Sequence, residues 1–322
     1  APLLRHDRHR HGHGQGTRAR SAAARARVLR RVLSPAADLE RAERVAVGRR
    51  RLDAHQVGGQ PPQRRRGRAA LSRRVIMRAL SPSVVRKLEQ DFVEDAERLV
   101  DEVLAQGEIE AVVAIAEAFP TRVFPRAVGI KQPDARKLVD YGAMVFNAVG
   151  PDNELRQRVM ARAPEIVPWI NEQCDRSRLT EDGIGATIFA AADAGQIGEA
   201  EAGMLIRSLL SAGVDTTVSG IGSALWCLAQ HPEQFQYLRS EPTNLSGPAF
   251  EEALRFCTPV QAFFRTAGQD TTVSDIEIEE GTKILCVLGA ANRDPAKFEN
   301  PEAFDIGRDT RGHLALGVGV HS

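Results

Sequence analysis

The chain has 322 residues, of which 43% are apolar and 26% charged, an ordinary composition for a globular protein with a large core. It contains no run of eighteen apolar residues and no N-terminal secretory pattern, so we expect a cytoplasmic protein without a membrane span. Its four cysteines are widely spaced and form no Cys-x-x-Cys pair, which argues against a zinc site and against a disulfide framework.

The N-terminal segment differs strongly in charge from the rest of the chain. Residues 1–74 carry 20 arginines against 5 acidic residues, whereas the remainder carries 23 basic against 37 acidic residues. Residues 1–72 contain no Lys, Ile, Phe, Tyr, Trp, Met, Asn or Cys. So few large apolar groups cannot offset the cost of ordering the backbone, roughly 1–2 kcal/mol per residue. We therefore expect residues 1–72 to be disordered, with one Arg/Ala-rich helix near residues 21–32.

Two other interpretations of this segment are open. An Arg-rich, Lys-free composition is also typical of a GC-rich coding sequence translated out of frame. A basic arm could bind nucleic acid, although the segment lacks aromatic side chains for stacking on bases. The alternating His9, His11 and His13 have no nearby cysteine or carboxylate that would complete a metal site.

Helical patterns begin near Arg73. Ser81 and Pro82 predict a helix start, and apolar residues then recur at helical spacing up to Gly107. Further helices are expected over residues 134–148, 153–174, 200–231 and 249–256, and Pro232 ends the longest of them.

One stretch predicts a sheet. Val273, Ile276 and Ile278 alternate with polar residues, Gly281 lies in a turn, and residues 283–288 return as an apolar strand. The fold class expected from these elements is mainly α with a small β component.

Three motifs suggest chemistry. Residues 212–217, Ala-Gly-Val-Asp-Thr-Thr, place poor helix formers in the middle of the long helix, which indicates either a functional site or a tolerated kink. Glu252 and Arg255 lie one turn apart and can form an ion pair, either on the surface or buried among their apolar neighbours. Residues 312–322 alternate glycines with aliphatic residues, so that backbone amides can approach a ligand closely.

The order and separation of these three motifs resemble the cytochrome P450 family, and residues 264–266, 291–295 and 301–308 match further landmarks of that family. The resemblance implies a partial cytochrome P450 domain over residues 73–322, incomplete at the C-terminus, with haem b (iron protoporphyrin IX) as cofactor. It implies a bacterial monooxygenase that uses O2 and takes electrons from an iron–sulfur ferredoxin and its NAD(P)H-dependent reductase.

The resemblance also assigns roles to residues. Asp215 and Thr216 would relay protons during oxygen activation. Glu252, Arg255 and Arg308 would form an ion network that holds the haem loop. The residues implied in haem binding, either as cationic partners of the propionates or as close backbone contacts, are Arg73, Ala212, Gly213, Arg265, His313, Gly317, Gly319 and His321.

The sequence departs from the family pattern at three places. Leu316 replaces the usual Phe of the haem loop, and Ala69 replaces a His that would contact a propionate. The last residue, Ser322, stands directly before the position of the axial Cys, so we expect this chain to lack the metal ligand and to be inactive as written.

Within the family, residues 145–157, 207–213 and 259–265 resemble bacterial monooxygenases of para-substituted benzoates such as 4-methoxybenzoate. That likeness implies hydroxylation or O-demethylation of a small aromatic acid. Ser208 and Ser211, helped by Arg207, would contact the substrate carboxylate, and Phe263 would pack on the ring. The competing hypotheses are a non-catalytic cytochrome P450 fragment and a basic-tailed nucleic-acid-binding protein.

Overall fold

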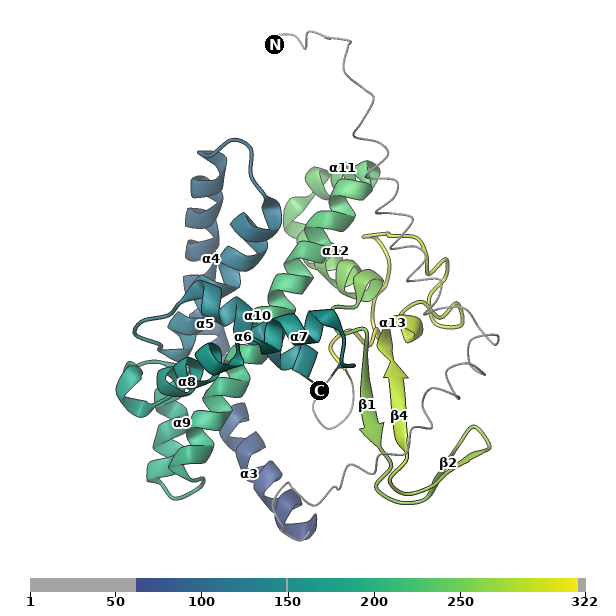
Figure 1. Ribbon diagram of the computed structural model, residues 1–322. Helices are drawn as coiled ribbons and strands as arrows, with labels where there is room; N and C mark the ends of the chain where they lie inside the picture. Colours follow the sequence, from purple (N-terminus) through teal and green to yellow (C-terminus); the bar gives the residue numbers. More distant parts are fainter. Residues whose placement is uncertain (1–61, 149, 318–322) are drawn as a thin grey trace. The chain divides into compact units, whose positions relative to one another are not determined.

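The computed structural model describes residues 62–148 and 150–317, which are mainly helical, as expected (Figure 1). The helices are α3 (Pro62–Ala79), α4 (Pro82–Leu104), the π-helix η2 (Val112–Glu117), α5 (Ala118–Val128), α6 (Ala135–Ala148), α7 (Glu154–Met160), α8 (Ala163–Gln173), the 3-10 helix η3 (Arg176–Arg178), α9 (Ile184–Asp193), α10 (Glu199–Gln230), α11 (Pro232–Ser240), α12 (Pro242–Cys257) and α13 (Leu288–Ala291). The strands are β1 (Ala262–Thr266), β2 (Thr271–Val273), β3 (Ile276–Ile278) and β4 (Lys283–Val287). Across these residues, no helix combines the length and hydropathy that a membrane crossing requires.

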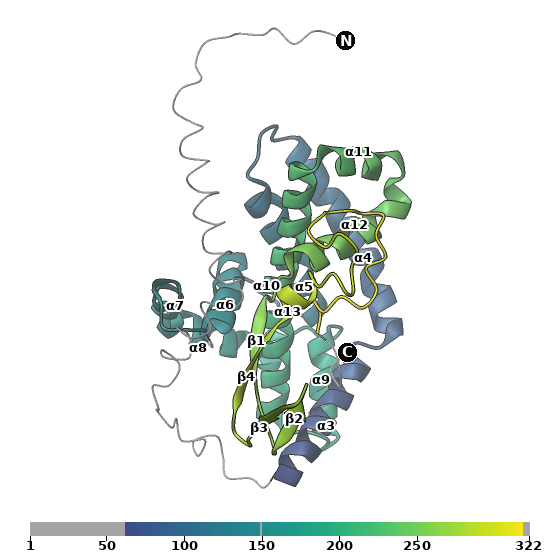
Figure 2. The ribbon, with the colours of Figure 1, turned by 90° about the vertical axis from the view of Figure 1, so that its right-hand side faces the viewer.

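The 32-residue helix α10 organises the core. It contacts α5, α6, α9, α12 and η2, and both ribbon views show it running among them (Figures 1 and 2). Its buried residues Ile206, Leu210 and Val214 are spaced four apart, so they form one apolar stripe that packs into the main core. Because α10 is covered on several sides, its remaining exposed face is the part that can meet a ligand.

The segment expected to be disordered is partly helical. Helix α3 begins at Pro62, so the expectation of disorder is wrong for residues 62–72. Arginine and alanine both favour helices, and the C-terminal half of α3 packs Val75 and Ala79 into the core beside α9. The Ser72 hydroxyl also donates to a Glu201 carboxylate oxygen at 2.5 Å. The expectations for residues 9–13 and 21–32 lie outside the described residues.

Two helix boundaries differ from the sequence expectation. The single helix expected over residues 153–174 is two helices, α7 and α8, because Pro164 lies in the first turn of α8, where its missing N–H is tolerated. The helix expected over residues 249–256 starts earlier, at Pro242, and includes Pro248 in its interior. Pro164 therefore marks the start of α8, whereas Pro248 is accommodated inside α12.

The strands pair differently from the expectation. Strand β4 is antiparallel to β1, a strand that the sequence pattern did not predict, and β2 pairs with β3. The turn between β2 and β3 is formed by Ser274 and Asp275, both with positive φ (48° and 66°), the geometry that suits a two-residue hairpin. The turn at Gly281 therefore connects β3 to β4 in the chain, but these two strands do not pair; β4 pairs with β1. Figure 2 shows β1 and β4 side by side.

Candidate functional site

A cavity of about 780 Å³ lies between α10, α12, β1, β4 and residues 314–317. We call it the α10–β1 cavity. Its lining residues are Ala212, Thr216, Thr217, Phe250, Leu254, Pro259, Val260, Phe263, Arg265, Cys286, Leu288, Leu314, Ala315, Leu316 and Gly317. The lining is mainly apolar with one cationic side chain. It brings together five of the residues expected from the sequence: Ala212, Thr216, Phe263, Arg265 and Gly317.

One face of α10 borders the cavity. Ala212 and Thr216, four residues apart, line the cavity from that face, whereas Ser208, one turn before Ala212, is not among the described residues that line it. The Thr216 hydroxyl donates to the Ala212 carbonyl at 2.5 Å, and the Ser208 hydroxyl donates to the Met204 carbonyl at 2.9 Å. Both hydroxyl oxygens keep acceptor capacity for a ligand or a water.

Gly213 faces an aromatic ring of α5. A Cβ added at Gly213 would lie 2.4 Å from Cε1 of Phe124 and 2.6 Å from its Cδ1. Gly213 is not among the described residues that line the α10–β1 cavity. The sequence suggested that this glycine lets a cofactor approach α10, whereas the close contact observed is with Phe124.

Asp215 lies where α10 crosses α6. A Cβ added at Gly142 of α6 would lie 2.7 Å from Cβ of Asp215, so this glycine makes room for the carboxylate side chain. Burial raises the pKa of Asp215 above its ordinary value of 3.8, because the ionised form loses solvation there. Asp215 thus neighbours Thr216 in sequence, but its side chain lies against Gly142 of α6, whereas Thr216 lines the α10–β1 cavity.

The raised pKa predicts how Asp215 affects stability as pH changes. Between pH 3.8 and the raised pKa the folded state binds more protons than the unfolded state, so stability falls as pH rises through this window. Asp215→Asn should therefore raise the melting temperature at pH 7, and the gain should shrink as pH falls towards 3.8. Thermal unfolding at several pH values measures this. Asp101→Asn, at an exposed position of α4, is the matched control and should change little. A gain that does not depend on pH would contradict the prediction.

Glu252 and Arg255 form a pair with no solvent exposure. The Arg255 Nε and Nη2 atoms donate to the two Glu252 carboxylate oxygens at 2.7 and 2.8 Å. Arg255 also donates to the backbone carbonyls of Asn292, Pro301 and Ala303. Arg308 adds a second cation, with its Nε 3.3 Å from Glu252. Nearly every donor of the buried guanidinium therefore has a partner, which a buried charge requires.

Asn292 connects this network to the glycine-rich loop. It is fully buried, its Nδ2 donates to the Thr258 hydroxyl at 2.8 Å, and its Oδ1 accepts from the Leu314 backbone N–H at 2.6 Å. Leu314 lines the α10–β1 cavity, so Asn292 positions one wall of the site. In the sequence, residues 291–295 stood out only as a family landmark, and no local pattern indicated a role for this side chain.

The cations expected to meet a cofactor are placed differently from one another. Arg265 lines the cavity, and its guanidinium stacks 3.9 Å from the ring centroid of Phe263. The Nε2 atom of His313 is 2.7 Å from a Glu251 oxygen, and its Nδ1 accepts from the Ala315 N–H, so both nitrogens are occupied. Arg73 is exposed on α3 and is outside the set of described residues that line the cavity. Gly319 and His321 lie outside the described residues.

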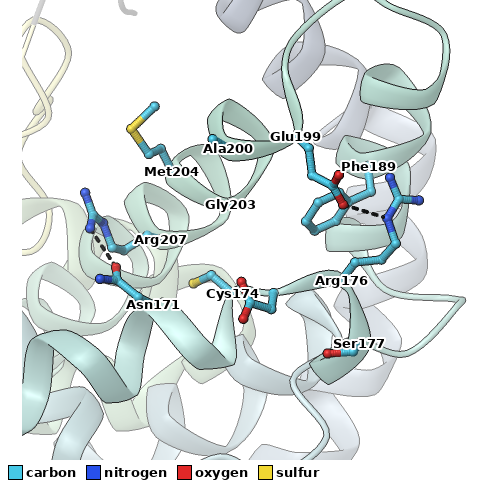
Figure 3. A pocket seen from close by; sticks show the side chains of 11 residues that line it. Asn171, Cys174, Arg176, Ser177, Phe189, Glu199, Ala200, Gly203, Met204 and Arg207 are labelled. Atoms are coloured by element: carbon cyan, nitrogen blue, oxygen red, sulfur yellow. Dashed lines mark hydrogen bonds and ion pairs between the residues drawn. The ribbon is translucent and has the colours of Figure 1, made fainter.

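Arg207 belongs to a second cavity, of about 830 Å³, between α8, α9 and α10. We call it the Arg207 cavity. Figure 3 shows Arg207 reaching from α10 to Asn171 on α8, and the Arg207 Nη1 donates to the Asn171 side-chain oxygen at 2.8 Å. Ser211 is buried and donates to the Ser208 carbonyl at 3.1 Å. None of the three residues expected to contact a substrate carboxylate is among the described residues that line the α10–β1 cavity, and Ser208 lies one turn before the lining residue Ala212.

The cysteines occupy three kinds of site. Burial raises the pKa of Cys174 to about 12, so its thiol is inert at neutral pH. Cys286 pairs opposite Phe263 and lines the α10–β1 cavity, which the sequence did not suggest. Cys227 and Cys257 lie side by side, with 3.5 Å between their sulfur atoms. Within the described part of the chain, no three His, Cys, Asp or Glu residues cluster as metal ligands.

Comparison with known sequences identifies relatives of this chain. Residues 132–311 match the family model described as Cytochrome P450. A protein from Rhodopseudomonas palustris named Cytochrome p450 CYP199A2 is 47% identical over 262 residues, which cover 81% of this chain and 62% of the relative. Cytochrome P450 144 from Mycobacterium tuberculosis is 32% identical over 256 residues, covering 78% and 59%. The chain thus spans about three-fifths of the length of these relatives.

Solved structures agree with this placement. The crystal structure of P450BioI in complex with an acyl carrier protein carrying hexadec-9Z-enoic acid has a TM-score of 0.69 and 29% identity, covering 81% of this chain and 68% of that one. Cytochrome P450 CREJ in complex with (4-ethylphenyl) dihydrogen phosphate has a TM-score of 0.67 and 28% identity, covering 81% and 65%. Because the family model matches more than half of the chain and the solved neighbours share its fold, the chain belongs to the cytochrome P450 family.

Proposed function

We propose that this chain forms the haem- and substrate-binding part of a monooxygenase that inserts one oxygen atom of O2 into a small aromatic acid. The substrate would be a para-substituted benzoate, and the reaction hydroxylation or O-demethylation. The observation that carries the proposal is the α10–β1 cavity, which sets the Thr216 face of α10 against Phe263, Arg265 and the loop of residues 314–317.

The cavity fits haem b in its chemistry. A flat apolar macrocycle needs apolar walls, which Leu254, Val260 and Leu316 provide, and cationic donors at its edge for the propionates. Arg265 would bind a propionate, and the backbone near Gly317, with φ at 78°, could approach the macrocycle closely. When bound, haem b supplies the chemistry that activates O2 and inserts oxygen into a C–H bond.

The chain's own residues would manage protons and water. The Thr216 hydroxyl, held by its bond to the Ala212 carbonyl, can accept a hydrogen bond from a water or from a reacting group. Asp215 is held by burial towards its protonated form, so it can deliver a proton to this face of α10 after a side-chain rotation. The apolar walls exclude bulk water, which limits wasteful proton transfer.

The proposed substrate class rests on Ser208 and Phe263. Ser208 lies eight residues before Thr216 on α10, about 12 Å along the axis, and one turn before the lining residue Ala212. A carboxylate bound near Ser208 would leave the para substituent directed towards Thr216, with the ring against Phe263. The ligand in the solved complex of CREJ, (4-ethylphenyl) dihydrogen phosphate, is also a para-substituted phenyl ring with an anionic group.

A calorimetric titration tests the substrate class. With the haem-reconstituted chain, 4-methoxybenzoate should bind at least about tenfold more tightly than uncharged 4-methoxybenzamide, since loss of a charge-assisted hydrogen bond costs about 1.5–3 kcal/mol. Ser208→Ala should remove most of this preference. Ser246→Ala is the matched control, because Ser246 also donates to the carbonyl four residues earlier but lies on α12 and not on α10, the helix proposed to bind the carboxylate. Equal binding of the acid and the amide would exclude a carboxylate site.

Haem binding provides a separate test. Haemin titration, followed by absorbance, should give a complex that Arg265→Ala weakens by about tenfold, since one charge-assisted contact to a propionate is lost. The matched control is Arg239→Ala, which removes another arginine stacked on a phenylalanine, Phe235 of α11. Equal weakening by both variants would show that Arg265 does not contact the cofactor.

The second candidate function is a cytochrome P450 fragment without monooxygenase activity. It is favoured by the position of the cysteine that lines the cavity, since Cys286 lies on β4 and not in the glycine-rich loop. The carbon monoxide difference spectrum of the haem-loaded chain separates the candidates: the fragment should lack the thiolate-type Soret band. If the band is present, its loss in Cys286→Ser would identify the cavity cysteine as the thiolate donor.

The remaining expectations of the resemblance are also proposals. A small iron–sulfur ferredoxin and its NAD(P)H-dependent reductase are the proposed electron donors, and the cytoplasm is the proposed compartment. The basic segment that motivated the nucleic-acid hypothesis lies almost entirely outside the described residues, and the cavity favours the enzyme.

A further inference from the structure

Two thiols meet where α10 packs on α12. Cys227 is in the last turn of α10, and Cys257 is the last residue of α12. Their sulfur atoms are 3.5 Å apart, and both cysteines are free. A disulfide bond is about 2.05 Å long, so the sulfurs need to approach by only about 1.5 Å. Neither thiol takes part in the function proposed above.

Only one of the two thiols is accessible. Cys227 has no solvent exposure and lies in a small apolar cluster with Ala249, Ala253 and Phe304. Cys257 is partly exposed and lines a cavity of about 440 Å³, together with Ser223, Trp226 and other residues of α10 and of the segment after α12. A small solute can therefore reach Cys257 first, with Cys227 directly behind it.

The surroundings favour a thiolate at Cys257. The hydrogen bond from the Cys227 thiol, another from Ser223 and the nearby Arg293 cation lower the pKa of Cys257 to about 7, against the effect of burial. Arg293 is held in place because its Nη2 donates to the Phe256 carbonyl at 2.7 Å. Cys227 keeps its proton, since its pKa is raised by the bond to Cys257 and by burial. Cys257 is thus the thiol of the pair that ionises more readily.

We propose that Cys257 and Cys227 form a redox modification site, in which a small peroxide oxidises Cys257 and Cys227 resolves the product to a disulfide. The Cys257 thiolate attacks one oxygen of hydrogen peroxide, so that an S–O bond forms, the O–O bond breaks, and one water leaves after protonation. The Cys227 sulfur then displaces hydroxide from the sulfenic acid, which forms the S–S bond and releases the second water. Two thiols lose two electrons in total, and the peroxide gains them.

The disulfide would act on the network that holds the candidate site. It would join α10 covalently to the end of α12, next to Thr258, whose hydroxyl accepts from Asn292. Asn292 in turn positions Leu314 in the wall of the α10–β1 cavity. The modification requires only the described thiols and their surroundings, so it does not depend on the function proposed above.

Thiol mapping of the full chain tests the proposal. At pH 7, iodoacetamide should alkylate Cys257 about tenfold faster than Cys286, the other partly exposed thiol, because the Cys227 hydrogen bond and the Arg293 cation stabilise the Cys257 thiolate. Stoichiometric hydrogen peroxide should remove two of the four free thiols and give one peptide pair linked through Cys227 and Cys257, which dithiothreitol separates. In Cys227→Ser, a sulfenic acid trapped by dimedone should accumulate on Cys257, whereas Cys286→Ser should form the disulfide as the wild type does.

The peptide map of the wild-type chain decides the matter even if a variant folds poorly. Faster alkylation of Cys286 than of Cys257 would overturn the assignment of the reactive thiol. Disulfides between two chains, or a wild-type Cys257 that stops at the sulfenic acid, would overturn the role of Cys227.

Discussion

Arg255→Ala is expected to destabilise the protein by about 3–5 kcal/mol, the usual cost of removing one partner of a buried ion pair. Arg255 and Glu252 have no solvent exposure, so the variant leaves a buried carboxylate without its main partner. It also removes the Arg255 donor from the backbone carbonyls of Asn292, Pro301 and Ala303, of which Ala303 keeps a longer bond from Arg308. Denaturant unfolding followed by circular dichroism measures the loss.

The chain supplies an exposed Arg–Glu pair, also joined by two hydrogen bonds, as a control. Arg122 on α5 donates through both Nη atoms to Glu102 on α4, at 3.0 and 2.6 Å, but both side chains are about half exposed. Arg122→Ala should therefore cost far less than Arg255→Ala. The double variant Glu252→Leu/Arg255→Met should recover much of the lost stability, because it leaves no uncompensated charge. Equal effects of Arg255→Ala and Arg122→Ala would show that burial of the pair is not decisive.

Gly213→Ala is expected to destabilise the protein by about 1–3 kcal/mol, because the new methyl group overlaps the Phe124 ring. In an ordinary helix the same change would be stabilising, since alanine favours helices by up to about 1 kcal/mol over glycine. A decrease in the free energy of unfolding would therefore indicate the overlap with Phe124, and an increase would indicate that the overlap is absent. Thermal unfolding of the variant without any cofactor gives this sign directly.

A second substitution separates two reasons for the glycine. If Phe124 is the obstacle, Phe124→Leu should cancel most of the cost of Gly213→Ala in the double variant. Gly222→Ala is the matched control in α10, since a Cβ there would only touch Ala116 at 3.9 Å. A Gly213→Ala chain that is as stable as the wild type, yet no longer binds haem, would instead support the interpretation that this glycine makes room for the cofactor.

Local chemistry made several elements predictable from the sequence. The helix over residues 82–104 begins at Pro82, as expected from its first-turn proline, although the Ser81 hydroxyl makes no capping hydrogen bond. Pro232 ends the long helix α10 within one residue of the expected position. The hydroxyl bond from Thr216 to the Ala212 carbonyl involves residues four apart, and the Glu252–Arg255 pair residues three apart. Such features depend on short stretches of chain, so spacing and residue type suffice to predict them.

Contacts between distant segments could not be predicted in this way. The partner of β4 is β1, the ring opposite Gly213 comes from Phe124, and the acceptor for His313 is Glu251. Each depends on which of many compatible surfaces meet when the helices pack, and no local pattern records that choice.

The sequence by itself determined most of the helices and the three motifs, because these follow from residue type at short spacing, and the family followed from what those motifs resemble. Only the tertiary structure decided which motif residues share a cavity. In the folded chain, Thr216 and Arg265 both line the α10–β1 cavity, and the Asp215 side chain lies against Gly142. It also brought Cys227 within 3.5 Å of Cys257 across 30 residues of chain. The physical reason is that close packing of the core fixes side-chain directions, and packing is a property of the whole fold.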